Sequence, residues 1–138
     1  MLRIAPFTEA LRRFEFEKFM DPEGEGAYYT FQDGLGNDYV VHFLPLLDRP
    51  GCFELEYLTQ EFDYQAMTAG FIPFSISNTV FGDILSDFAE HPGFSEIVIR
   101  PTDKRRSALY LRTIRARFRP PGWRINVDAK GDITLCRR

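Results

Sequence analysis

Few residues of this chain have the types and spacing that catalysis or metal binding requires. Glu54 and Glu56 share one face of a predicted strand, about 7 Å apart, a separation found in paired-carboxylate hydrolases. Alternating glutamates on an exposed strand face more often serve solvation and edge protection, and we favour that interpretation. His42 and His91 are far apart in the sequence and have no nearby cysteine or His-x-x-His spacing. No metal site is therefore predicted.

The charged residues are sorted along the chain. From Asp21 to Glu96 there are 14 acidic residues and one basic residue, Arg49, whereas Arg100 to Arg138 contains 12 basic and 3 acidic residues. Such segregation creates surfaces of opposite sign, which steer charged partners but do not determine a fold.

One surface of the basic half predicts a specific interaction. On a helix from Lys104 to about Arg119, with 100° between residues, four arginines fall within about 80° of one another. They are Arg105, Arg112, Arg115 and Arg119. Arginine binds carboxylates and phosphates through forked hydrogen bonds. Three partners stay open: the acidic part of the same molecule, an acidic protein surface or second copy, and a nucleic acid. The nucleic acid is disfavoured, because a pI near 5.4 and the acidic half oppose a phosphate backbone.

The hydrophobic pattern predicts the elements that position these residues. Clusters of turn-forming residues end the predicted helices and strands, and Thr102 or Asp103 caps the longest helix. Helices are predicted over residues 8–20, 77–88 and 104–119, and strands over 28–33, 39–44, 53–57, 71–76, 96–99, 123–127 and 132–136. The predicted fold class is α+β, a single domain over residues 1–138 with a mostly antiparallel sheet, an N-terminal helix and two C-terminal helices.

Composition places the chain among globular proteins. The 14 phenylalanines among 138 residues predict a core built on Phe. No apolar run approaches the roughly 18 residues that span a bilayer, and the N-terminal sequence lacks an apolar signal core, so a cytoplasmic protein without a membrane partner is predicted. The two cysteines, Cys52 and Cys136, lack CxxC spacing and are predicted to be reduced, partly buried thiols.

The element order and several short motifs resemble known proteins. Ala108-Leu109-Tyr110, followed by Gly122-Trp123, looks like the ALY helix and the glycine-aromatic pair of the GCN5-related N-acetyltransferases. Residues 79–88 and 106–112 also resemble small uncharacterised bacterial and phage proteins that carry TVF-x-x-IL-x-DF and R-x-x-LY-x-R segments. The resemblance covers about residues 79–138 and implies an acetyltransferase-like fold.

The resemblance also implies roles for particular residues. Tyr110 would be the catalytic acid that protonates a leaving thiolate. The amides of Ser77, Asn78 and Thr79 would hold the pyrophosphate of acetyl-CoA at a helix N-terminus. Residues 75–82 lack the paired glycines and the Arg or Gln of the family's cofactor loop.

The sequence therefore predicts a non-catalytic, cytoplasmic, acetyltransferase-like interaction or accessory module without a cofactor. Its predicted partner is an acidic protein surface or a second copy of the chain. Two alternatives stay open: a divergent acyl-CoA-dependent N-acyltransferase, and an accessory protein that binds nucleic acid through its basic helix.

Overall fold

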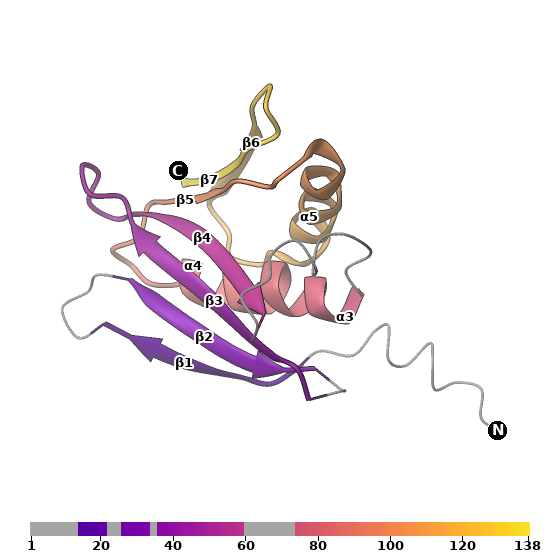
Figure 1. Ribbon diagram of the computed structural model, residues 1–138. Helices are drawn as coiled ribbons and strands as arrows, with labels where there is room; N and C mark the ends of the chain where they lie inside the picture. The colour runs from indigo at the N-terminus through magenta and orange to yellow at the C-terminus, as the bar shows by residue number, and fades with distance from the viewer. Residues whose placement is uncertain (1–13, 22–25, 34–35, 60–73) are drawn as a thin grey trace.

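The computed structural model describes residues 14–21, 26–33, 36–59 and 74–138 (Figure 1). Within these residues, seven strands form one mixed sheet in the order β1-β2-β3-β4-β5-β7-β6. The described helices pack together against one face of the sheet, and we call the other face the open face.

The N-terminal half is an antiparallel meander of four strands. They are β1 (Phe16–Met20), β2 (Ala27–Gln32), β3 (Asp38–Pro45) and β4 (Cys52–Thr59). Buried residues alternate with more exposed ones along β2 and β3, and Tyr29, Val41 and Phe43 point into the core. The predicted hairpin and third antiparallel strand are confirmed.

The helix predicted over residues 8–20 is wrong where the structure describes it. Residues 16–20 form β1, which pairs with β2 from Phe16 opposite Phe31 to Met20 opposite Ala27. Residues 1–13 of the predicted helix lie outside the described residues. The spacing of apolar residues around Phe14 and Phe16 suits either a helix or a strand. Pairing with β2 selects the strand, in which both rings pack against the core.

Three short helical segments follow one another over residues 74–89. They are α3 (Phe74–Ser77), the π-helical η1 (Asn78–Ile84) and α4 (Leu85–Ala89). A strand was predicted over residues 71–76, but 74–76 are helical and 71–73 lie outside the described residues. Gly82 permits close approach to the neighbouring helix, because an added Cβ would lie 2.8 Å from the Cβ of Arg117.

The C-terminal half contains β5 (Glu96–Ile99), α5 (Lys104–Arg117), β6 (Trp123–Val127) and β7 (Ile133–Arg137). β5 pairs parallel with β4, and β7 lies between β5 and β6, antiparallel to both. Parallel neighbours need a crossover, and the chain makes it through the helical segments of residues 74–89. The predicted strand over residues 96–99 and the closing hairpin are confirmed. The predicted helix from Lys104 is also confirmed, although it ends at Arg117.

Aromatic rings dominate the core, in agreement with the composition. Phe88 of α4 is fully buried and stacks on Phe43 of β3 with ring centroids 3.8 Å apart. Its ring also meets those of Phe53 and Phe94, at 5.0 and 4.5 Å. This cluster attaches α4 to the meander and to the loop before β5.

Arg137 of β7 fixes the end of the same helical segment. Its Nε donates to the carbonyl oxygen of Phe94 at 2.8 Å, and its Nη2 donates to those of Ala89 and His91 at 2.9 and 2.8 Å. The guanidinium also lies 4.8 Å from the ring centre of Trp123. One side chain thus binds carbonyl oxygens at the end of α4 and in the loop that leads to β5.

The predicted fold class is wrong as stated. The described residues form a seven-stranded mixed sheet, with a strand where an N-terminal helix was expected. The first of the two predicted C-terminal helices is instead two short α-helical turns on either side of a π-helical segment. Among the described helices, none has the length and apolar character needed to cross a membrane.

Candidate functional site

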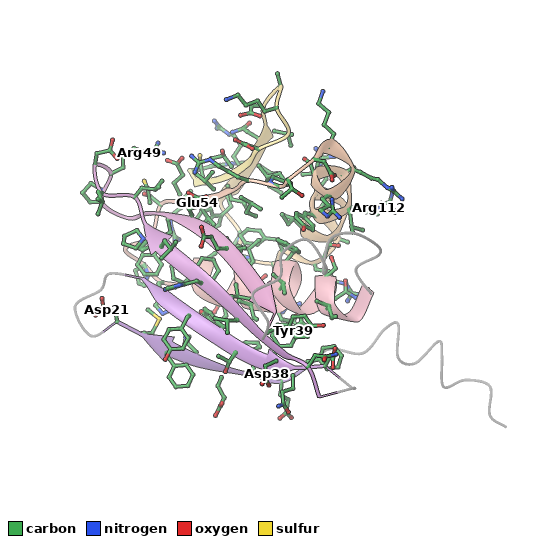
Figure 2. The ribbon with its side chains drawn as sticks, viewed as in Figure 1. Asp21, Asp38, Tyr39, Arg49, Glu54 and Arg112 are labelled. Carbon is green, nitrogen blue, oxygen red and sulfur yellow. The ribbon has the colours of Figure 1, made fainter. Side chains whose placement is uncertain are left out.

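α5 presents its basic residues to solvent while its apolar side packs inward. Asp103 caps the helix by accepting a hydrogen bond from the amide of Arg106 at 2.8 Å, and this bond lowers the pKa of the Asp103 carboxyl. Tyr110 and Ile114 are buried on the inner side of the helix. On the outer side, Arg112 projects away from the sheet (Figure 2).

Three of the four predicted arginines form the exposed surface that we call the arginine face. It consists of Arg105, Arg112 and Arg115, all exposed. None of these three side chains makes an ion pair with a described residue. The fourth, Arg119, follows the end of α5 and pairs with Asp83, with 3.3 Å between Nη2 and Oδ1. The arginine face is therefore smaller than the sequence predicted.

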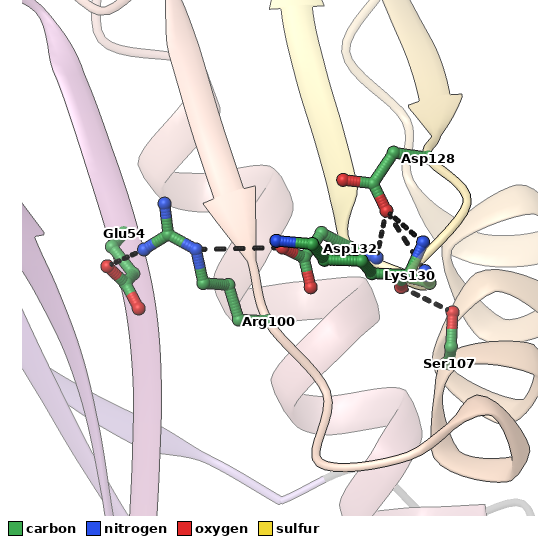
Figure 3. A network of polar contacts seen from close by, with 7 residues as sticks. Glu54, Arg100, Ser107, Asp128, Lys130 and Asp132 are labelled. Atoms are coloured by element: carbon green, nitrogen blue, oxygen red, sulfur yellow. Dashed lines mark hydrogen bonds and ion pairs between the residues drawn. The ribbon is translucent and has the colours of Figure 1, made fainter.

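The acidic part of the molecule does not neutralise the arginine face within the described residues. Glu54 pairs instead with Arg100, which also lies 3.7 Å from Asp132 (Figure 3). Glu54 and Glu56 lie on the open face, because they alternate with the buried Phe53 and Leu55. Internal pairing with Glu54, Glu56 or Asp63 was left open by the sequence; pairing with Glu54 or Glu56 is not seen, and Asp63 lies outside the described residues.

The β6–β7 turn holds the beginning of α5 in place. One carboxylate oxygen of Asp128 accepts hydrogen bonds from the amides of Lys130, Gly131 and Asp132 at 2.9 to 3.0 Å. Ser107 of α5 donates to the carbonyl oxygen of Gly131 at 2.6 Å (Figure 3). The arginine face is therefore carried by a helix that is attached at its N-terminal end to the sheet.

Tyr110 lies in the packed interface between α5 and η1. It is 3% exposed, and its ring stacks on that of Phe81 with centroids 4.2 Å apart. This position gives the ring a packing role, and its role as a catalytic acid stays a prediction.

Ser77, Asn78 and Thr79 lie where α3 passes into η1, and their exposed fractions are 0%, 7% and 0%. The Ser77 and Thr113 hydroxyls are 2.8 Å apart, and the Thr79 hydroxyl accepts a hydrogen bond from the amide of Phe14 at 3.1 Å. A phosphate group would have to displace these contacts. Ser77 therefore faces α5, whereas Thr79 faces the residues before β1.

The histidines and cysteines show no sign of reactive chemistry. Nδ1 of His91 lies 3.0 Å from the carbonyl oxygen of Phe88, and the described residues contain no group of three potential metal ligands. Burial raises the pKa of the Cys52 thiol, and it also raises that of Cys136. Raised pKa values keep both thiols in the less reactive protonated form.

An exposed row of rings crosses the open face, and sequence reasoning did not find it. Phe19 lies opposite Tyr28, Tyr28 opposite His42, and His42 opposite Glu56 on four neighbouring strands. Phe19 and Tyr28 are each 42% exposed and stack with centroids 4.8 Å apart, and the His42 ring is 6.0 Å from that of Tyr28. We call Phe19, Tyr28 and His42 the aromatic row. Residues 16–20 do not alternate between apolar and polar types, so no signal in the sequence would place Phe19 beside Tyr28.

Comparisons with protein-family models, curated proteins and solved structures gave no match. The surfaces of the molecule are therefore the basis for assigning a function.

Proposed function

We propose that this protein is a non-catalytic interaction module that binds an acidic protein surface through the arginine face of α5. The observation that carries the proposal is the absence of any ion pair between Arg105, Arg112 or Arg115 and a described residue, although the chain has an excess of carboxylates. Exposed guanidinium groups that pair with no carboxylate of the described residues are available to a partner.

The charges in the first turn of α5 are unfavourable for the isolated helix. The sequence of α5, KRRSALYLRTIRAR, contains six basic residues and no acidic residue. Lys104, Arg105 and Arg106 occupy the first turn, where the helix dipole disfavours positive charge. Like charges one turn apart also repel each other. Residues that lower local stability are expected at functional surfaces, because function rather than stability requires them there.

The residue type indicates the chemistry of the partner. Arginine forms two parallel hydrogen bonds to a carboxylate, and its weakly hydrated guanidinium is suited to interfaces. Arg105 and Arg112 are two turns apart, and Arg115 lies on the same side one turn further on. The face therefore fits a series of carboxylates spaced along a strand or a helix. Opposite charges of this kind would accelerate encounter and orient the partner.

Binding of a fluorescein-labelled glutamate-rich peptide, measured by anisotropy in about 50 mM and about 500 mM salt, tests the proposal. We expect binding that weakens with salt and a Kd at least about tenfold higher for the triple variant Arg105→Glu, Arg112→Glu, Arg115→Glu. The matched control reverses three exposed charges elsewhere: Arg124→Glu, Lys130→Glu, Arg138→Glu. It should bind like the unmodified protein, and equal losses in both variants would refute a specific face.

A short duplex DNA serves as the second ligand in the same assay. We expect no binding to it in about 150 mM salt, where nonspecific binders reach Kd values of about 10⁻⁴ to 10⁻⁶ M. Micromolar DNA binding that falls steeply with salt and is lost in the arginine-face variant would replace the acidic protein with a nucleic acid as the partner.

A further inference from the structure

The aromatic row has the chemistry of a surface that receives cations. Its exposed rings lie between Glu17, which is exposed on the open face of β1, and Glu56 at the end of the row on β4. The only lysine or arginine in β1–β4 is Lys18, and its Nζ lies 2.9 Å from Asp87 on the helix-covered side. A guanidinium group can stack on exposed rings and pair with neighbouring carboxylates at the same time.

The arginine face carries the complementary groups, and its dimensions fit the row. From Arg105 to Arg115 an α-helix rises about 15 Å. Across four neighbouring strands, from Phe19 on β1 to Glu56 on β4, the sheet spans about 14 Å. A helix laid across the strands along the row would therefore bring its three arginines over the rings and carboxylates.

The two surfaces cannot meet within one molecule. Tyr110 and Ile114 bury the inner side of α5 against the helix-covered side of the fold. Arg112 points away from the sheet (Figure 2), whereas the strand register places the aromatic row on the open face. The occupant of the row must come from a second molecule.

We propose that the aromatic row of one copy binds the arginine face of a second copy of this chain. The inference rests on the proposed function of the arginine face, for which it names the partner. Each copy carries one surface of each kind, so the contact joins different surfaces, and association continues unless it closes into a ring. Because opposite charges hold the contact, salt weakens it.

Light scattering coupled to size-exclusion chromatography tests the proposal with two complementary variants. The helix variant is Arg105→Glu, Arg112→Glu, Arg115→Glu, which leaves the aromatic row intact. The sheet variant is Glu17→Gln, Tyr28→Ser, Glu56→Gln, which leaves the arginine face intact and gives the row no positive charge that could attract the helix variant. The pair Glu17→Gln, Glu56→Gln is a second sheet variant that keeps the packed ring, should the first fail to fold.

In about 50 mM salt the unmodified protein is expected to gain mass with rising concentration, and in about 500 mM salt to be monomeric. Each variant alone is expected to be monomeric, whereas an equimolar mixture of the two gives twice the monomer mass and no more. The control variant Arg124→Glu, Lys130→Glu, Arg138→Glu is expected to associate like the unmodified protein.

Three results would overturn the inference: an unmodified protein that is monomeric at every concentration, a mixture that stays monomeric, or a variant that associates on its own. If self-association is absent but the glutamate-rich peptide still binds through the arginine face, the proposed function stands and the second copy is the wrong partner. If the arginine-face variant also leaves peptide binding unchanged, both proposals fail.

Discussion

Arg137 is the residue whose replacement should reveal most about how the two halves of the fold are joined. It lies on β7, yet its side chain donates to three carbonyl oxygens, those of Ala89, His91 and Phe94, between the end of α4 and β5. Replacement by methionine keeps an unbranched apolar chain of similar shape but removes all the donors. We therefore expect Arg137→Met to lower the free energy of unfolding without changing the fold.

The magnitude follows from the contacts that are lost. A hydrogen bond from a charged donor contributes about 1.5 to 3 kcal/mol, and a cation–π contact such as that with Trp123 contributes about 0.5 to 2 kcal/mol. Arg137 is only half-buried, so water can reach part of the vacated site and replace some of the hydrogen bonds. We expect a net loss of about 3 kcal/mol for Arg137→Met. Arg137→Lys should lose about half as much, because a single ammonium cannot reproduce the forked contacts.

Urea unfolding followed by tryptophan fluorescence measures the loss. With a urea m value of about 2 kcal/mol per M, a loss of 3 kcal/mol would lower the midpoint by about 1.5 M. Arg138→Met is the matched control, because the neighbouring arginine is exposed, and it should change stability by less than about 0.5 kcal/mol. Equal midpoints for the two variants would refute the structural role of the Arg137 contacts.

Three further measurements examine other features. Gly82→Ala should lower the free energy of unfolding by about 1 kcal/mol, because overpacking against Arg117 outweighs the better helix propensity of alanine. Gly93→Ala is the control in the same urea assay and should be neutral, because Gly93 has open space around it. Burial raises the pKa of Tyr29 above its usual value of 10.0, and the hydrogen bond to Asp87 raises it further. The neutral Tyr29 hydroxyl therefore stabilises the folded state fully below pH 10, and this contribution is lost as the pH rises towards the folded pKa. Tyr29→Phe should be less stable than the unmodified protein at pH 8, and the difference in stability should be smaller at pH 11. Millimolar acetyl-CoA should leave the melting temperature unchanged, since a ligand at 100 times its Kd would add about 2.7 kcal/mol, and a clear rise would favour an acyltransferase.

Local sequence signals predicted the elements whose pattern has a single interpretation. The strict alternation of residues 53–57 and the turn residues before residues 39–44 led to two correctly paired strands. Thr102 or Asp103 was predicted to cap the longest helix from its type and its position before a helical period, and the structure shows that Asp103 is the cap. The short segment Phe16–Met20 has a pattern that suits a helix or a strand, and only its pairing with β2 decides between them.

The candidate site could be predicted only where one element carries it. The arginine face lies on a single helix, so helical periodicity was enough to group Arg105, Arg112 and Arg115. The aromatic row needs the register of three strands, and the wrong assignment of residues 16–20 removed Phe19 from the sheet. Periodicity also could not show that Arg119 follows the end of α5 and pairs with Asp83, because both facts depend on tertiary packing.

The place of β7 in the sheet has a consequence for the order in which the protein folds. β7 follows β6 in the chain but lies between β5 and β6, so nothing joins β6 to the rest of the sheet until residues 133–137 have been synthesised. The meander of β1–β4 consists of neighbours in sequence and can pair while the ribosome is still making the C-terminal half. A nascent chain would thus hold a nearly complete acidic half while the basic helix is still undocked. Long-range closure by β7 is then the last step, and it brings Arg137 to the end of α4.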